Sequence, residues 1–295
     1  MIADVVIIGS GPAGIQAAIH SSRKKANTIL IGKPANSAIS GAHVENYFGV
    51  AGVVDGNALL QIGSEQARSF GCKMIEQNVV DAEGSNGAFT ITIESGEIIE
   101  ARTVILATGV SRVKLNVPGE KELLGKGVSY CATCDCNFFK GVPVAIIGNE
   151  SEAAISSTMM TRYASKVYWV SDGLDVDTAL VLKAKEAGVE IIDSRAVAII
   201  GDTEVTSLRL KENVEIPVKG VFIELGGKSS ENIAMDLGMF PETDDTIRVN
   251  DRCETTVAGV FACGDVTGKP WQVAKAVGQG SIAGANAADH SKVSK

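Results

Sequence analysis

The sequence predicts an α/β protein made of two Rossmann-like, three-layer ββα nucleotide-binding domains, one inserted in the other. Two βαβ patterns support this, because an apolar strand, a glycine loop and a helix begin near residue 3 and again near residue 142. A third observation is a late strand, 259–265, that runs into a closing helix. We therefore expect 1–113 and 246–295 to form one discontinuous domain and 114–245 to form the inserted one.

The elements follow from the spacing of apolar residues. The run 3–8 is short, β-branched and almost continuously apolar, which predicts a buried parallel strand. A helix over 15–25 and a strand over 27–31 complete the first βαβ pattern. The second pattern and the remaining elements are predicted as strands over 142–147, 166–171 and 189–192, helices over 151–164, 175–187 and 274–288, and alternating antiparallel segments over 79–106 and 197–225. Pro118-Gly119 and Pro241 are the expected crossing points between the domains.

Composition narrows the class of protein. The 295 residues suffice for two domains with their own cores. The net charge of −8 argues against nucleic acid as a partner, which needs a basic surface. The first ten residues lack the basic start of a signal peptide, and no apolar stretch approaches the roughly 18–20 residues that span a bilayer. We expect a cytoplasmic protein with no membrane partner, in which the six cysteines do not form a static disulfide framework.

The first motif is Gly9-Ser10-Gly11-Pro12-Ala13-Gly14. It fits G-x-G-x-x-G directly after a strand and at the start of a helix, which is the context of a dinucleotide site. Gly9 suits the tight turn, Gly11 lets the backbone approach a pyrophosphate, and Gly14 lets the helix pack closely on the strand. The motif predicts dinucleotide binding.

Two further turns follow apolar strands. They are Ala107-Thr108-Gly109 and Cys263-Gly264-Asp265. Doubly wound sheets bind ligands at the carboxyl ends of their strands. Asp265 can accept hydrogen bonds from a ribityl chain, and the helix that follows can direct its positive end at a flavin ring.

Cys131-Ala132-Thr133-Cys134-Asp135 is the remaining motif. Two cysteines separated by two residues can close an exchangeable disulfide, and an adjacent carboxylate can move protons. The alternative is a metal site that also uses Cys136. The chain has no second CxxC, however, and its three histidines are not at ligand spacing. The other cysteines fit small core positions, while Cys136 stays open between a structural residue and a modulating thiol.

Together with Val44-Glu45-Asn46-Tyr47-Phe48-Gly49, these motifs resemble, in order and over nearly the whole chain, the low-molecular-weight thioredoxin reductase family. The resemblance implies a homodimer with FAD in the discontinuous domain. It also implies that Cys134 exchanges electrons with FAD, that Cys131 forms the mixed disulfide with thioredoxin, and that Asp135 is the acid/base. The FAD-binding set that it implies is Gly9, Gly11, Pro12, Ala13, Gly14, Asn46, Thr108, Gly109, Gly264, Asp265, Gln272, Val273 and Ala274.

The inserted domain departs from the family pattern. Its second loop has Glu150 where the family, with G-G-G-x-x-A, has the glycine that approaches the NADPH pyrophosphate. Two like charges ~4 Å apart repel by about 1 kcal/mol in water and by several times that in a partly desolvated site. The family's basic segment for the 2′-phosphate is replaced by one with Asp172, Asp175 and Asp177. Asp172 suits an NADH ribose, but Glu150 opposes either nicotinamide. We expect this domain to survive as a rigid frame for the CxxC.

The resemblance thus predicts a thioredoxin-disulfide reductase whose electrons come from reduced ferredoxin. The alternatives left open are a deazaflavin or NADPH as donor, a peroxiredoxin-like partner, a dithiol oxidase of the same fold, and a non-enzymatic flavin or metal sensor. Trp271 is open between a residue that covers the flavin and a core residue.

Overall fold

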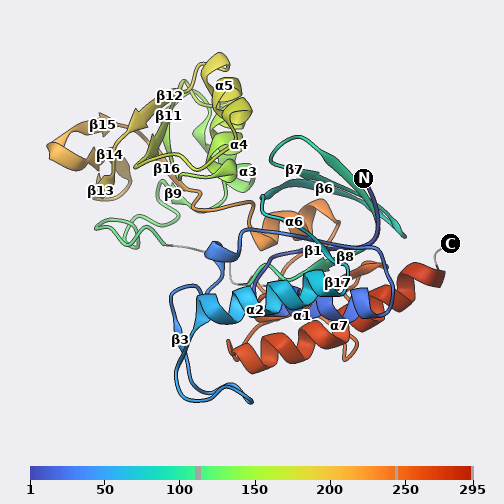
Figure 1. Cartoon of the computed structure of the whole chain (residues 1–295). Helices are drawn as coiled ribbons and strands as arrows, with labels where there is room; N and C mark the ends of the chain where they lie inside the picture. The colour runs from blue at the N-terminus through green and yellow to red at the C-terminus, as the bar shows by residue number, and fades with distance from the viewer. Residues whose placement is uncertain (110–113, 243–244, 294–295) are drawn as a thin grey trace. The chain divides into compact units, whose positions relative to one another are not determined.

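The computed structural model describes residues 1–109, 114–242 and 245–293. The chain forms two compact units, which are 1–111 with 228–295 (unit 1) and 112–227 (unit 2). Both units are shown in Figure 1, coloured along the chain. Each is a mixed α/β body with a largely parallel central sheet, in agreement with the predicted fold class.

Unit 1 contains a seven-stranded sheet with the order β5-β2-β1-β8-β7-β6, and β17 pairs with β8. Its strands are β1 (Ile2–Ile8), β2 (Thr28–Ile31), β5 (Lys73–Ile75), β6 (Val79–Ser85), β7 (Ala88–Ile93), β8 (Ile98–Leu106) and β17 (Val260–Ala262). A separate hairpin pairs β3 (His43–Val44) with β4 (Val54–Asp55). Strand β8 has two roles, because its first half pairs antiparallel with β7 and its second half lies parallel between β1 and β17.

The sheet is the middle layer of three, with one hydrophobic core on each of its faces. Helices α1 (Pro12–Arg23), α2 (Gly56–Ser69) and α7 (Val273–Val293) pack on one face, where alanines from α1 and α7 meet Val5 and Ile7 of β1. The opposite face of β1 packs in a second core that includes β6, β7 and α6 (Ser230–Asp236). Strand β1 is therefore buried on both sides, which explains its continuous apolar run.

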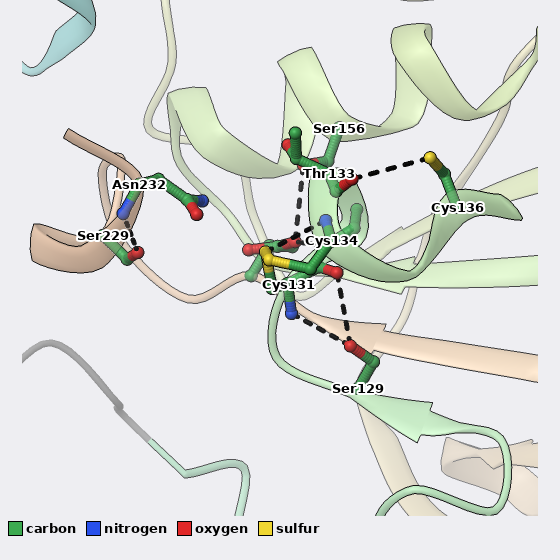
Figure 2. The surroundings of a disulfide bond; sticks show 10 residues. Ser129, Cys131, Thr133, Cys134, Cys136, Ser156, Ser229 and Asn232 are labelled. Atoms are coloured by element: carbon green, nitrogen blue, oxygen red, sulfur yellow. Dashed lines mark hydrogen bonds between the residues drawn. A yellow bond between two sulfur atoms is a disulfide. The ribbon is translucent and has the colours of Figure 1, made fainter. Parts of the chain in front are cut away.

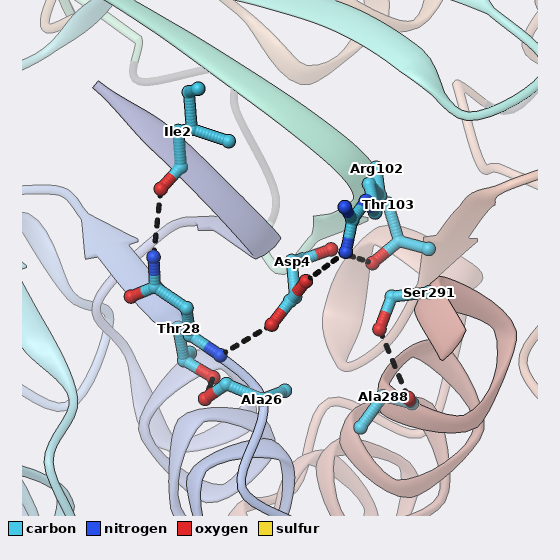
Figure 3. Close-up of polar contacts among 9 residues, drawn as sticks. Ile2, Asp4, Ala26, Thr28, Arg102, Thr103, Ala288 and Ser291 are labelled. Atoms are coloured by element: carbon cyan, nitrogen blue, oxygen red, sulfur yellow. Dashed lines mark hydrogen bonds and ion pairs between the residues drawn. The ribbon is translucent and has the colours of Figure 1, made fainter. Parts of the chain in front are cut away.

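Polar contacts hold the start of β1 in register with its neighbours, as Figure 3 shows. The Asp4 carboxylate accepts a hydrogen bond from Arg102 Nη1 at 2.6 Å and another from the Asn27 amide at 2.9 Å. Thr103 Oγ1 donates to the Asp4 carbonyl at 2.9 Å. These contacts join β1 to β8 and to the start of β2, and the opposite, carboxyl ends of the strands are left to carry the ligand-binding turns.

Unit 2 repeats the three-layer plan. Its parallel sheet has the order β12-β11-β10-β16-β9, made of β9 (Val128–Ser129), β10 (Pro143–Ile147), β11 (Lys166–Ser171), β12 (Glu190–Asp193) and β16 (Gly220–Ile223). One face is covered by α3 (Ala132–Asp135), α4 (Ser151–Met160) and α5 (Thr178–Glu186). The other is covered by the antiparallel strands β13 (Ala196–Gly201), β14 (Val205–Leu210) and β15 (Glu215–Pro217).

The expected domain boundaries need correction. The first, at 113/114, falls at residues 110–113, which lie outside the described residues. Pro118 and Gly119 are not a crossing point, because the Pro118 carbonyl accepts a hydrogen bond from the Ile199 amide inside unit 2. The return to unit 1 occurs at residue 228 rather than at 246. The physical reason is α6, whose apolar face joins the core of unit 1.

Among the described residues, no helix is both long and apolar enough to cross a membrane.

Candidate active site

The first glycine loop joins β1 to α1. Gly9 has a φ of +109°, and a Cβ there would lie 2.3 Å from the Ala107 carbonyl oxygen. A Cβ at Gly14 would lie 1.8 Å from the Gly9 carbonyl oxygen, so the fold itself requires both glycines. Gly11 differs, since it has ordinary extended dihedrals and a Cβ would approach only the Ser37 side chain, at 3.2 Å. The room beside Gly11 is what a pyrophosphate needs at a helix N-terminus.

Three turns meet at the carboxyl ends of the parallel strands β1, β8 and β17. The contact of Gly9 with Ala107 joins the first two turns. Gly264, with a φ of +82°, lies against α1, because a Cβ there would be 2.8 Å from that of Ala13. Lys275 of α7 donates from Nζ to the Gly264 carbonyl at 3.0 Å and also to the Gly268 carbonyl. The structure thus brings together motifs that are far apart in the sequence, at the edge where such sheets bind ligands.

Two polar atoms at this edge are buried without a protein partner. Ser10 Oγ and Asp265 Oδ1 make no hydrogen bond within the part of the chain that the structure describes. Burial raises the pKa of the Asp265 carboxyl, and the neighbouring Lys275 charge opposes that rise. A buried polar group without a partner is costly, so a ligand that bonds to it gains affinity. An acceptor at Asp265 and an open helix N-terminus at Gly11 fit the ribityl chain and pyrophosphate of FAD.

The remaining predicted cofactor residues also lie on unit 1. Asn46 Nδ2 donates to Gln272 Oε1 at 3.0 Å. Thr108 Oγ1 accepts a hydrogen bond from Ser230 Oγ at 2.5 Å, which joins the turn after β8 to α6. The other positions in the predicted set are Pro12, the first residue of α1; Gly109, with a φ of +73°; and Val273 and Ala274, the first two residues of α7.

Unit 2 carries the CxxC motif, drawn in Figure 2. Cys131 and Cys134 form a disulfide, with 5.3 Å between their Cα atoms. Cys131 is the N-cap of the short helix α3, and its Sγ accepts a hydrogen bond from the Cys134 amide at 3.2 Å. The Cys131 amide donates to Ser129 Oγ at 3.0 Å, which fixes the chain at the end of β9. Cys134 is exposed, while Cys131 and Asp135 are half-buried.

A buried carboxyl group lies beneath this disulfide. Glu224, the residue after β16, is 4% exposed, and its Oε1 accepts a hydrogen bond from the Ala132 amide at 2.8 Å. Ser156 Oγ of α4 donates to the same oxygen at 3.4 Å. Burial first, and then the nearby Glu152 charge, raise the pKa of Glu224 to about 8. Its surroundings therefore favour the protonated form of this carboxyl group.

The second glycine loop joins β10 to α4 and is filled by its own side chains. Glu150 is the N-cap of α4 and is 6% exposed, and Glu152 in the first turn is 5% exposed. The Asn149 carbonyl accepts a hydrogen bond from the Asp175 amide at 2.8 Å, so the acidic segment after β11 lies against this loop. The fully buried Trp169 donates from Nε1 to the Gly148 carbonyl at 2.8 Å. The loop thus differs from that of unit 1 in carrying two buried carboxyl groups.

Two sequence alternatives can be compared with the structure. Trp271 is 52% exposed, with Lys269 Nζ 5.2 Å from its ring centroid, so the core alternative is wrong for this residue. Cys136 is buried and donates from Sγ to the Thr133 carbonyl at 3.6 Å, as a structural residue would. Cys72, Cys253 and Cys263 are buried as well. Across residues 1–109, 114–242 and 245–293, no group of three or more His, Cys, Asp or Glu side chains is arranged to hold a metal ion.

Sequence reasoning missed four residues of this region: Ser10, Glu152, Glu224 and Lys275. For Glu224 there was a signal, since one acid directly follows the apolar run Gly-Val-Phe-Ile. For Lys275 the signal was a cation in the first turn of a helix, where the helix dipole disfavours it. Ser10 and Glu152 carry no sequence signal of their own, because only the surrounding packing buries them.

Comparison with known proteins agrees with this geometry. The family model described as pyridine nucleotide-disulphide oxidoreductase matches residues 3–280. A thioredoxin reductase of Listeria innocua is 37% identical over 299 residues, covering 97% of this chain and 93% of that protein. One of Aquifex aeolicus is 36% identical over 275 residues, covering 89% and 85%.

Solved structures give the same result. An atypical thioredoxin reductase of Desulfovibrio vulgaris Hildenborough superposes with a TM-score of 0.81, at 32% identity and 98% coverage of both chains. A ferredoxin-flavin thioredoxin reductase of Clostridium acetobutylicum gives a TM-score of 0.68, at 34% identity, covering 98% of this chain and 97% of that one. The chain therefore belongs to the pyridine nucleotide-disulphide oxidoreductase family and, within it, to the FAD-binding thioredoxin reductases.

Proposed function

We propose that this thioredoxin reductase takes its electrons from reduced ferredoxin rather than from NADPH or NADH, and passes them through FAD and the Cys131–Cys134 pair to thioredoxin. The observation that carries the proposal is Glu150. It is the N-cap of α4 with dihedrals of −119° and −171°, and Gly11 is the N-cap of α1 with nearly the same ψ, −174°. Where unit 1 leaves room for a pyrophosphate, unit 2 has a buried carboxyl group.

The far end of the would-be nucleotide site supports the same conclusion. A 2′-phosphate is usually held by cations after the strand that follows the glycine loop. Here that position carries Asp172, Asp175 and Asp177. The hydrogen bond from the Asp175 amide to the Asn149 carbonyl also draws this segment onto the loop. Charge and space therefore both oppose a nicotinamide dinucleotide.

Ferredoxin is favoured over a deazaflavin because a one-electron carrier needs only access to an edge of the flavin. The exposed Trp271, stacked with Lys269, directly precedes the predicted flavin residue Gln272. An exposed aromatic ring with a cation suits the docking of an acidic electron carrier. A solved neighbour is itself named a ferredoxin-flavin thioredoxin reductase. Trp271→Ala is therefore expected to slow flavin reduction by ferredoxin more than it weakens FAD binding.

Each proposed site residue then has a defined task. The glycine loop from Gly9 to Gly14 and the Asp265 carboxyl hold FAD, which when bound supplies the electrons that reduce the disulfide. Cys134 receives those electrons, and Cys131 attacks the disulfide of thioredoxin. Asp135, next to Cys134 at the end of α3, holds and moves the proton that the departing thiolate needs.

The test is anaerobic bleaching of the yellow flavin band, with NADPH, NADH and reduced ferredoxin compared on the purified protein. We expect ferredoxin to bleach the band and the nicotinamides to fail at micromolar concentration. Rapid bleaching by NADPH would overturn the proposal. The Cys134→Ser variant serves as the control, because its flavin should still be reduced while thioredoxin reduction is lost.

A homodimer and a cytoplasmic location complete the proposal, and both rest on the family resemblance. Sedimentation of the FAD-loaded protein tests the first. A mass of one chain at micromolar concentration would reject it.

A further inference from the structure

Three of the buried glutamates of unit 2, Glu150, Glu152 and Glu224, stand where unit 1 has small residues. Counted from the N-caps of α1 and α4, Glu150 matches Gly11 and Glu152 matches Ala13. Glu224 matches Ala107, because the Gly9 Cβ position lies 2.3 Å from the Ala107 carbonyl oxygen and that of Gly148 lies 2.0 Å from the Glu224 carbonyl oxygen. Three positions that carry small residues in unit 1 thus carry buried carboxyl groups in unit 2.

One of these carboxyl groups contacts the redox centre. Oε1 of Glu224 accepts its 2.8 Å hydrogen bond from Ala132, the residue directly after Cys131 and the first residue of α3. The same side chain is 4% exposed, so water screens its charge poorly. The charge of Glu224 therefore changes next to the backbone amide that directly follows Cys131.

We propose that Glu224 is a positioning residue of the dithiol centre, which holds the Cys131–Ala132 turn and sets how readily Cys131 becomes a thiolate. The inference rests on the proposal that Cys131 and Cys134 are the redox pair, and it is independent of the electron donor. Reduction breaks the sulfur–sulfur bond with two electrons from the flavin. Two protons then give two thiols, and one proton gives a thiol and a thiolate.

The groups that face Glu224 are defined. From α4, whose N-cap is Glu150, they are the Glu152 carboxyl and the Ser156 hydroxyl. From α3 they are the Ala132 amide and the Cys131–Cys134 pair. The end of β10 adds the uncharged Ile147 and Gly148. None of these groups is a cation. Two carboxyl groups in one buried site do not both ionise easily, so the pair keeps a proton to higher pH than an ordinary carboxyl group would.

The sign of the effect follows. Below about pH 8 Glu224 is neutral and does not oppose a thiolate at Cys131. Above that pH its negative charge raises the pKa of the Cys131 thiol. The two groups therefore titrate as a coupled pair, and the thiolate forms over a broader pH range than a single thiol would show.

The experiment is alkylation of the reduced protein by iodoacetamide from pH 6 to 10, with Cys131 and Cys134 resolved by peptide mass spectrometry. In the native chain we expect the rate at Cys131 to rise in two steps. In Glu224→Gln, which keeps the acceptor for the Ala132 amide, it should rise in one step and be about three- to tenfold faster above pH 8. Glu152→Gln should move the upper step to lower pH.

Glu204→Gln provides the matched control. It makes the same charge change on unit 2, but at an exposed carboxylate that pairs with Lys219 at 2.7 Å, and its profile should equal that of the native chain. A native profile in Glu224→Gln would overturn the inference. Should Glu224→Gln fail to fold, Ser156→Ala provides a second variant. It should move the upper step of the alkylation profile to higher pH. If that step does not move in Ser156→Ala, the inference is overturned as well. Thioredoxin reduction is measured separately in Cys131→Ser. If this variant still reduces thioredoxin, the proposed redox pair fails, and that result is distinguishable from failure of this inference.

Discussion

The loops after β1 and β10 share one backbone plan and differ in what fills them. Each follows a parallel strand, ends at an N-cap without a side-chain cap and begins a helix on the sheet. In unit 1 the positions compared are Gly11, Ala13 and Ala107, while in unit 2 the matching positions carry three glutamates. We therefore propose that the same supersecondary structure serves as a cofactor cradle in one unit and as a polar support for a disulfide in the other.

If the proposed function is right, a shared backbone shape does not by itself provide a ligand site. Gly148 is retained because a Cβ would lie 2.0 Å from the Glu224 carbonyl oxygen, a demand of the fold alone. Nothing in the packing around Gly11 makes a similar demand, since its Cβ position touches only the Ser37 side chain. A glycine that the protein does not need for itself is the stronger sign of a ligand.

The largest expected effect comes from transferring the carboxyl group to the first loop. Gly11→Glu should weaken FAD binding more than about 100-fold, because it adds bulk and negative charge where the pyrophosphate lies. Flavin content after purification measures this. Gly11→Ala is the control, and it should keep most of its FAD because the added methyl group meets only one flexible side chain. A yellow, fully loaded Gly11→Glu protein would break the comparison.

The reverse change is expected to act more weakly. Glu150→Gly alone should leave reduction by NADPH slow, because the segment with Asp172 still repels the 2′-phosphate. Adding Asp172→Arg should speed flavin bleaching by NADPH about tenfold or more, measured by stopped flow. If Glu150→Gly alone restores rapid bleaching, then one carboxyl group accounts for the whole loss of the site.

Asp265 allows a test of the first loop's surroundings. Asp265→Asn should weaken FAD binding about tenfold, which corresponds to one lost charged hydrogen bond. In the protein without FAD, the same substitution is expected to reduce the loss of folding stability with rising pH. Burial raises the pKa of this carboxyl in the folded chain, so its contribution to folding falls as pH rises from its ordinary value to the raised one. The FAD-free variant should therefore lose less stability than the native chain over that pH range, as urea unfolding would show.

The last prediction concerns Glu224 and the stability of the fold. Its folded pKa of about 8 lies above the ordinary 4.5, so the folded chain binds more protons between these values and loses stability as pH rises. Glu224→Gln removes this loss, and the stability of the variant relative to the native chain should increase from pH 5 to 8 in urea unfolding. An unchanging difference would mean that Glu224 is already ionised at pH 5.

Much of the site could be predicted from local chemistry. The G-x-G-x-x-G loop, the CxxC motif and the acidic replacements in the second loop are short patterns whose residue types state their own requirements. Helix α2 was not predicted, and its capping signal, Asp55 accepting from the Asn57 amide at 2.6 Å, was present in the sequence. The predicted boundary near residue 246 was wrong because α6 is too short to reveal by periodicity which core it joins.

By itself the sequence determined the two βαβ units, the glycines and the pairing of Cys131 with Cys134, because these depend on residues close together along the chain. The tertiary structure decided which distant residues meet. Parallel pairing of β10 with β16 brings Glu224 to Gly148 and to the Ala132 amide, and the joint packing of β1, β8 and β17 brings Asp265 to the first loop. Burial of a carboxyl group, and the proton it then keeps, depend on neighbours from several elements and not on its place in the sequence.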